Sequence, residues 1–129
     1  MHIHHIAIWV HDLERIKSFY EKYFEANAGK LYVNPVKEFS SYFLEFKGGG
    51  RLEIMTNPKI NNPFFDEDEQ IAGFTHLAIS VGTKEAVDQL TGQLRNDGYK
   101  IVGEPRITGD GFYESVVLDP EYNRIEITI

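Results

Sequence analysis

The order of hydrophobic and polar positions is nearly the same in the two halves of the chain. Residues 5–10 and 76–81 alternate between aliphatic and small or polar side chains, and this period of two predicts a β-strand in each half. The segment after each strand has apolar residues at steps of three and four, which predicts an amphipathic helix. The two apolar stripes are Leu13, Ile16, Phe19, Tyr20, Tyr23 and Phe24 in the first half, and Ala86, Val87, Leu90 and Leu94 in the second.

Residues that start or stop a helix flank both predicted helices. Asp12 and Thr83 stand just before the apolar stripes, and their side-chain oxygens can accept hydrogen bonds from the free amides of the first turn. Gly29 and Gly98 follow the stripes, where a glycine commonly ends a helix because it adopts a positive φ without strain. We therefore expect the helices to run between these residues.

Three short strands are predicted after each helix. They lie at residues 30–33, 39–46 and 51–55 in the first half, and at 100–102, 112–118 and 124–129 in the second. Residues 48–50 and 119–123 supply the turns of the last hairpin in each half. Each half is thus predicted to be a β-α-β-β-β module, which places the chain in the α+β class with mixed sheets.

The length of 129 residues is typical of a single domain. Within it, module one is expected at residues 1–56 and module two at 73–129. The linker between them, residues 57–72, contains two prolines and an acidic run at 66–69, which predicts an exposed loop.

Polar residues recur at equivalent positions of the two modules. His5 matches His76, and Glu53 follows His5 at almost the same separation as Glu126 follows His76. The alternation of side chains places all four on the polar face of the predicted sheets, opposite the aliphatic face that must cover the helices. Arg51 and Arg124 share the polar face, whereas His4 is expected on the helix side, next to Ile6.

This set of side chains indicates a metal site. A single histidine or glutamate on a strand more often has a structural or solvated role, but the recurrence of the same two residues in both modules favours a shared function. Two carboxylates close together repel each other, and a divalent cation removes that repulsion. Two imidazoles and two carboxylates suit Zn²⁺, Ni²⁺, Co²⁺, Fe²⁺ or Mn²⁺. The predicted ligands are His5, Glu53, His76 and Glu126.

Composition narrows the classes of partner. The net charge of −7 disfavours binding to nucleic acid or to an anionic membrane, which leaves a small molecule as the expected substrate. The chain has no cysteine, no basic and apolar leader at its start and no apolar stretch long enough to span a bilayer. A cytoplasmic protein is the expectation.

Several motifs together resemble the vicinal-oxygen-chelate superfamily, the group of glyoxalase I, bleomycin-resistance proteins and extradiol dioxygenases. They are residues 4–8 (HHIAI), 18–20 (SFY), 52–54 (LEI), 75–81 (THLAISV) and 118–126 (LDPEYNRIE). The resemblance covers nearly the whole chain. It implies two β-α-β-β-β modules whose sheets curl around a metal ion.

The pattern His5, Glu53, His76, Glu126 matches that of bacterial glyoxalase I. The resemblance implies a lyase or isomerase that acts on the hemithioacetal of a 2-oxoaldehyde and a thiol, usually glutathione. A carboxylate among the ligands would move the proton between the two carbons, so Glu53 and Glu126 are the candidate bases, with Glu126 favoured. The resemblance also implies a homodimer.

Of two positions that bear on the substrate, one matches the family and the other does not. Bacterial glyoxalase I usually has an arginine where this chain has Trp9, whereas Asn57 matches an asparagine that contacts glutathione. Glutathione is therefore an open question, and an adduct of another thiol is an alternative. The last turn also departs from the family, because Tyr122 replaces its usual glycine and is expected to need a positive φ or a different turn.

Other functions within the superfamily stay open at this point. An epimerase of the methylmalonyl-CoA epimerase kind resembles this chain too, but commonly has glutamine at the position of Glu53. A non-catalytic drug-binding protein like the bleomycin-resistance members lacks the four ligands that are present here. Extradiol dioxygenases use two histidines and one glutamate, so a fourth ligand argues against them.

Overall fold

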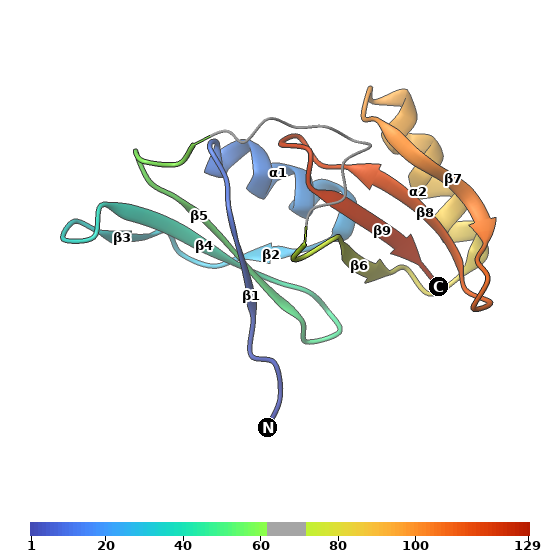
Figure 1. Ribbon diagram of the computed structural model, residues 1–129, viewed down its shortest axis with the longest axis horizontal. Coiled ribbons are helices and arrows are strands. Elements are labelled where there is room, and N and C mark those ends of the chain that lie inside the picture. The colour runs from blue at the N-terminus through green and yellow to red at the C-terminus, as the bar shows by residue number, and fades with distance from the viewer. Residues whose placement is uncertain (62–71) are drawn as a thin grey trace. The chain divides into compact units, whose positions relative to one another are not determined.

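The computed structural model describes residues 1–61 and 72–129, which form two compact units, Met1–Phe64 and Phe65–Ile129 (Figure 1). Each unit has one helix and one sheet. The acidic run at 66–69 and most of the predicted linker 57–72 lie outside the described residues.

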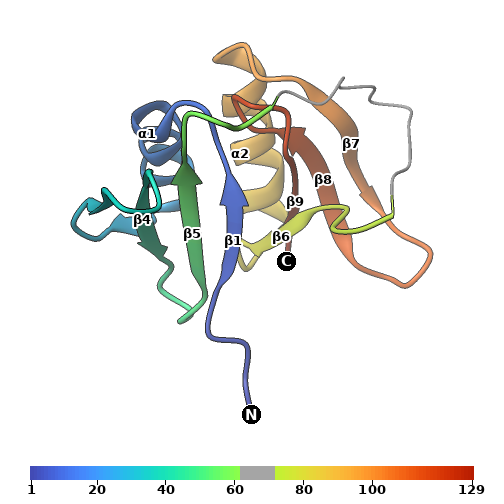
Figure 2. The same cartoon turned by 60° about the vertical axis from the view of Figure 1, so that its left-hand side comes forward.

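The first unit carries its elements in the predicted order, with one short strand in addition. They are β1 (Ile6–Trp9), α1 (Leu13–Phe24), β2 (Asn27–Ala28), β3 (Tyr32–Asn34), β4 (Phe39–Glu45) and β5 (Arg51–Thr56). The sheet order is β1-β5-β4-β2, with β3 also paired to β4, and β1 runs parallel to β5. Figure 2 shows β1, β5 and β4 side by side, with α1 behind them.

The second unit repeats this plan. Its elements are β6 (Leu77–Ser80), α2 (Lys84–Asn96), β7 (Ile101–Ile107), β8 (Tyr113–Leu118) and β9 (Arg124–Thr128). The sheet order is β6-β9-β8-β7, with β6 parallel to β9. The strand registers are equivalent, since Ala7 pairs with Glu53 in the first unit and Ala78 with Glu126 in the second. The predicted α+β class with two mixed sheets is confirmed.

The helices begin as predicted but do not both end as predicted. The side chains of Asp12 and Thr83 accept hydrogen bonds from the amides of Arg15 and Ala86, at 3.0 and 3.1 Å. In the second unit Gly98 has a φ of 88° just beyond α2, as expected. In the first unit the left-handed residue is Glu25, with a φ of 51°, rather than Gly29.

Gly29 lies beside β4 and not at the end of α1. Its amide donates to the carbonyl of Phe43 over 2.8 Å, so it continues the sheet that β2 begins. Glu25 ends the helix instead because its backbone N–H bonds back to the carbonyl of Tyr20, and its carboxylate pairs with Lys47. The prediction of a helix stop at Gly29 was wrong, since the closing hydrogen bond forms four residues earlier.

Alternation along the strands separates a core face from a polar face in each unit. Leu44, Leu52 and Ile54 are buried toward α1, and Val117, Ile125 and Ile127 toward α2. Residues of the opposite face, such as Ala7 and Ala78, are exposed. The predicted division into a helix-covered face and a polar face therefore holds in both units, and the polar face is where His5, Glu53, His76 and Glu126 lie.

The turn between β8 and β9 accommodates Tyr122 with a φ of 68°. The buried carboxylate of Asp119 stabilises this turn: one oxygen accepts from the amides of Glu121 and Asn123 at 2.8 and 2.9 Å, and the other accepts from the side chain of Asn123 at 2.9 Å. The turn therefore keeps its shape with a tyrosine where the sequence predicted a need for positive φ. It also fixes the position at which β9, and with it Glu126, begins.

Removing this carboxylate is expected to destabilise the second unit. Asp119→Ala leaves three donors without their acceptor, so we expect the free energy of unfolding to fall by about 2–4 kcal/mol in urea titrations. Asp119→Asn retains one acceptor oxygen and should cost about half as much. Equal stability of the alanine variant and the parent protein would contradict this role for the turn.

Candidate metal centre

The first unit brings His5 and Glu53 together on the polar face of its sheet. His5 directly precedes β1, and Glu53 lies in the adjacent, parallel strand β5. The Nε2 atom of His5 is 3.5 Å from Oε2 of Glu53. The glutamate side chain is largely buried, with 13% of its surface exposed, whereas that of the histidine is 36% exposed. The buried carboxylate thus faces an imidazole that solvent can still reach.

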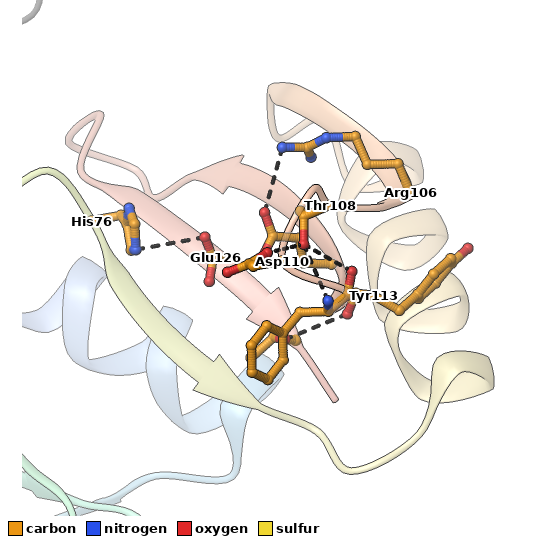
Figure 3. A network of polar contacts seen from close by, with 9 residues as sticks. His76, Arg106, Thr108, Asp110, Tyr113 and Glu126 are labelled. Carbon is orange, nitrogen blue, oxygen red and sulfur yellow. Dashed lines mark hydrogen bonds and ion pairs between the residues drawn. The ribbon is translucent and has the colours of Figure 1, made fainter.

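The second unit repeats this pair. His76 directly precedes β6, Glu126 lies in β9, and Nε2 of His76 is again 3.5 Å from Oε2 of Glu126. Figure 3 shows the side chains of His76 and Glu126 pointing toward one another. The exposed fractions, 41% and 19%, follow the same order as in the first unit. The sequence repeat is therefore also a repeat of side-chain geometry.

The geometry of each pair fits two ligands of one ion. A separation of 3.5 Å exceeds the roughly 2.7–3.2 Å of a good N–H···O hydrogen bond. Nitrogen and oxygen ligands each about 2.0–2.2 Å from an ion are roughly 2.8–3.6 Å apart for tetrahedral or octahedral angles. Among residues 1–61 and 72–129, no group of three or more His, Cys, Asp or Glu side chains is close enough to hold a metal. The structure thus brings the four predicted ligands together as two pairs, one in each unit.

The surroundings of His5 differ from the sequence prediction. His4 was expected on the helix side, but it is exposed, and its Nδ1 lies 2.8 Å from Nδ1 of His5. Its other ring nitrogen, Nε2, lies 3.0 Å from Nη1 of Arg51. His4 lies outside β1, so its position in the alternation does not fix the side to which its ring points. His4 and Arg51 therefore lie directly behind His5.

The surroundings of Glu126 contain a residue that the sequence did not single out. Glu114 of β8 is buried and lies on the same sheet face, because its neighbour Val116 pairs with Glu126. Burial raises the pKa of Glu114, and the charge of Glu126 raises it further. Arg106 partly offsets this effect, with Nη2 at 3.4 Å from Oε1 of Glu114. The available signal was an acidic residue in a strand that is mostly apolar toward its end, but only the strand register shows that it lies beside Glu126.

The two predicted substrate contacts lie in the first unit. Trp9 ends β1 and is 52% exposed, on the same face as His5. Asn57 follows β5 and lines a hollow of about 620 Å³, together with His11, Asn34, Phe39 and Ser40. Its side-chain oxygen accepts from the amide of Lys59 at 2.7 Å.

Comparison with known proteins gives the family of this fold. The model of the Glyoxalase/Bleomycin resistance protein/Dioxygenase superfamily matches residues 2–127, nearly the whole chain. The chain belongs to this superfamily. The resemblance of its motifs to the vicinal-oxygen-chelate group is thereby confirmed.

Three similar proteins illustrate the match. The uncharacterized protein YqjT of Bacillus subtilis is 28% identical over 130 residues, which cover 97% of this chain and 96% of that protein. The trypanothione-dependent glyoxalase I of Leishmania major has the same fold at 24% identity, with a TM-score of 0.78 over 99% of this chain and 86% of that one. Glyoxalase I of Zea mays matches with a TM-score of 0.76 and 23% identity over 97% of this chain, which spans only 43% of the maize chain.

Membership of the superfamily fixes the fold but not the activity, because the superfamily contains both enzymes such as glyoxalase I and non-enzymatic binding proteins. No helix among residues 1–61 and 72–129 has the length and apolar character needed to cross a membrane.

Proposed function

We propose that the protein is a glyoxalase I-like enzyme, a divalent-metal-dependent lyase or isomerase of 2-oxoaldehyde–thiol adducts. The observation that carries this proposal is the repeated pair: His5 with Glu53 and His76 with Glu126, each at 3.5 Å. Paired imidazole and carboxylate ligands suit a divalent ion such as Ni²⁺, Zn²⁺, Co²⁺, Fe²⁺ or Mn²⁺. A binding protein that holds its ligand without a metal has no need for two such pairs.

As the family resemblance implies, we propose that His5, Glu53, His76 and Glu126 are all ligands of one ion. When bound, the ion supplies Lewis-acid stabilisation of the negative charge that develops on the substrate's oxygens. We further propose a homodimer as the active form, as the family resemblance implies. The net charge of −7 repels a polyanion. A small substrate that is uncharged, or whose charge is paired by a side chain of the site, is therefore more suitable.

The proton transfer is assigned to the carboxylates. In the hemithioacetal, Glu126 would take the proton from the carbon that bears sulfur and return it to the adjacent carbonyl carbon, which gives the 2-hydroxy thioester. The hydroxyl proton also moves from the oxygen of the first carbon to the oxygen of the adjacent carbon, so the rearrangement consumes no other reactant. Glu126 has Glu114 as a carboxyl neighbour, whereas Ser41 occupies the matching position beside Glu53. This difference supports Glu126 as the base.

The thiol part of the substrate is proposed to lie along β5 toward Asn57. Glu53 lies within β5 and Asn57 directly follows this strand, so an extended thiol that starts at the metal and follows β5 would reach Asn57. The hollow at Asn57 has Glu38 in its lining, and Lys59 pairs with Glu38 at 3.1 Å. With Trp9 in place of an arginine, this arrangement favours a thiol with fewer free carboxylates than glutathione.

Metal loading followed by turnover tests the proposal. Protein stripped by a chelator and reloaded with Ni²⁺, Zn²⁺ or Mn²⁺ is expected to convert methylglyoxal in the presence of a suitable thiol, with thioester formation followed by absorbance. The stripped protein should lose at least about 100-fold in rate, and readdition of metal should restore it. Protein that binds no divalent ion would refute the metal site. Protein that binds metal but turns over no thiol adduct would refute the lyase activity alone.

A further inference from the structure

His5 is the end of a chain of three hydrogen-bonding groups. Its Nδ1 lies 2.8 Å from Nδ1 of His4, and Nε2 of His4 lies 3.0 Å from Nη1 of Arg51. The free end of the chain is Nε2 of His5, which faces Glu53. Phe43 packs against both ends, with its ring 5.2 Å from that of His5 and 4.4 Å from Cζ of Arg51. The order of the chain is thus Arg51, His4, His5, and Glu53 faces its end.

The direction of these hydrogen bonds follows from the chemistry of the groups. A guanidinium can only donate, so Nε2 of His4 must accept from Arg51 and carry no proton. The proton of neutral His4 is then on Nδ1, which donates to Nδ1 of His5. Because Nδ1 of His5 accepts, the proton of neutral His5 is on Nε2, the atom that faces Glu53.

A metal requires the opposite arrangement at His5. The ligating nitrogen must offer its lone pair, and the other ring nitrogen of a metal-bound histidine normally donates a proton to an acceptor behind it. Here Nε2 carries the proton, and the group behind Nδ1 is a donor as long as Arg51 contacts His4. The contact between Arg51 and His4 and the ligation of a metal by His5 therefore exclude each other when both imidazoles are neutral.

We propose that Arg51 and His4 form a switch that controls metal loading at the first-unit pair. In its closed state, Arg51 holds His5 in the tautomer that cannot ligate. In its open state, Arg51 leaves His4, the proton of His4 moves to Nε2 and the proton of His5 moves to Nδ1, so that no proton is gained or lost. This regulation rests on the proposed function, in which His5 is a metal ligand.

Arg51 has partners to retain it after it leaves His4. Its Nε lies 3.3 Å from Oε1 of Glu45, and its guanidinium lies over the ring of Phe43. Release from His4 therefore does not leave the charge unpaired. The switch costs one hydrogen bond between exposed groups, which is a small barrier compared with the free energy of binding a divalent ion.

The second unit provides an internal control for this switch. Arg124 occupies the position of Arg51, at the start of the last strand, but Thr75 precedes His76 where His4 precedes His5. A threonine has no second ring nitrogen to relay the direction of a hydrogen bond. The pair of His76 and Glu126 therefore lacks this relay, and the switch acts on the ligand of the first unit.

The tautomers themselves test the switch in metal-free protein. Long-range ¹⁵N–¹H NMR spectra of the stripped full-length chain, recorded near pH 8.5, should show a proton on Nε2 of His5 and on Nδ1 of His4. Saturation with Zn²⁺ should exchange both assignments. A metal-free His5 with its proton on Nδ1 would overturn the switch while the metal site stands. Spectra of His5 that do not change with Zn²⁺ would overturn the switch together with His5 as a ligand.

Zn²⁺ affinities of variants test the same switch through its consequence. His4→Phe keeps a ring but breaks the relay, so Zn²⁺ affinity from competition with a chelator should rise about tenfold. Arg51→Gln should raise it as well, by opening the switch and by removing a positive charge. In the His4→Phe background, Arg51→Gln should produce only the charge effect, which Arg124→Gln in the second unit measures separately. Fully additive effects of His4→Phe and Arg51→Gln, or weaker binding by His4→Phe, would overturn the proposal.

Discussion

His76→Ala is expected to weaken Zn²⁺ binding by about 100-fold. The binding free energy of a four-ligand zinc site is about 10–16 kcal/mol, which gives each ligand roughly 3 kcal/mol, and 1.4 kcal/mol corresponds to a factor of ten. His76 presents Nε2 to Glu126 at 3.5 Å, so its loss leaves that carboxylate as the single ligand of its pair. The affinity is measured by competition with a chromogenic chelator of known strength.

The repeat supplies matched comparisons for this experiment. His5→Ala removes the equivalent ligand of the first unit and should have a similar effect, while His2→Ala removes an exposed histidine outside both pairs and should have none. An unchanged affinity for His76→Ala, or an equal loss for His2→Ala, would contradict the four-ligand site.

Mixing the two ligand variants distinguishes a site within one chain from a site shared by two chains. If each ion is held by the His5 pair of one subunit and the His76 pair of its partner, a heterodimer of His5→Ala and His76→Ala retains one intact site. Zn²⁺ binding and turnover should then recover in part after the two variants are unfolded together and refolded. No recovery is expected if each ion is held within a single chain.

Glu126→Gln is expected to reduce kcat by about 10²–10⁴-fold, the range found for loss of a general base. Glutamine preserves the shape of the side chain and an oxygen ligand, but it cannot accept the proton from the substrate carbon. Turnover of the methylglyoxal–thiol adduct is measured at saturating metal, so that any loss of metal affinity does not enter the rate. Exchange of the substrate proton with deuterated solvent should fall in parallel.

Glu53→Gln is the matched control, since Glu53 has the same distance to its histidine in the first unit. We expect a smaller loss of kcat for this variant, because Glu53 acts as a ligand without taking the proton. A larger loss for Glu53→Gln than for Glu126→Gln would transfer the role of base to Glu53. Equal retention of activity in both variants would contradict a carboxylate base altogether.

The family and the candidate ligands were accessible from the sequence because both depend on local pattern. The alternation of a strand and the spacing of a helix involve residues only a few positions apart, and the same pattern occurs in both modules. The order of elements and the helix caps at Asp12 and Thr83 were confirmed, and of the two alternatives for Tyr122 the structure has the positive φ. The helix end predicted at Gly29 was wrong, because Gly29 forms a hydrogen bond to Phe43 across the sheet and does not end α1.

The sequence by itself determined that this chain has two β-α-β-β-β modules and that each carries a histidine and a glutamate at equivalent positions of its polar face. Only the tertiary structure decided the distance between the histidine and the glutamate of each unit, and which side chains surround them. Glu114 is beside Glu126, and His4 is between His5 and Arg51, because strands distant in sequence are fixed in register by their hydrogen bonds. Periodicity assigns a side chain to a face, but only the register of paired strands assigns its neighbours.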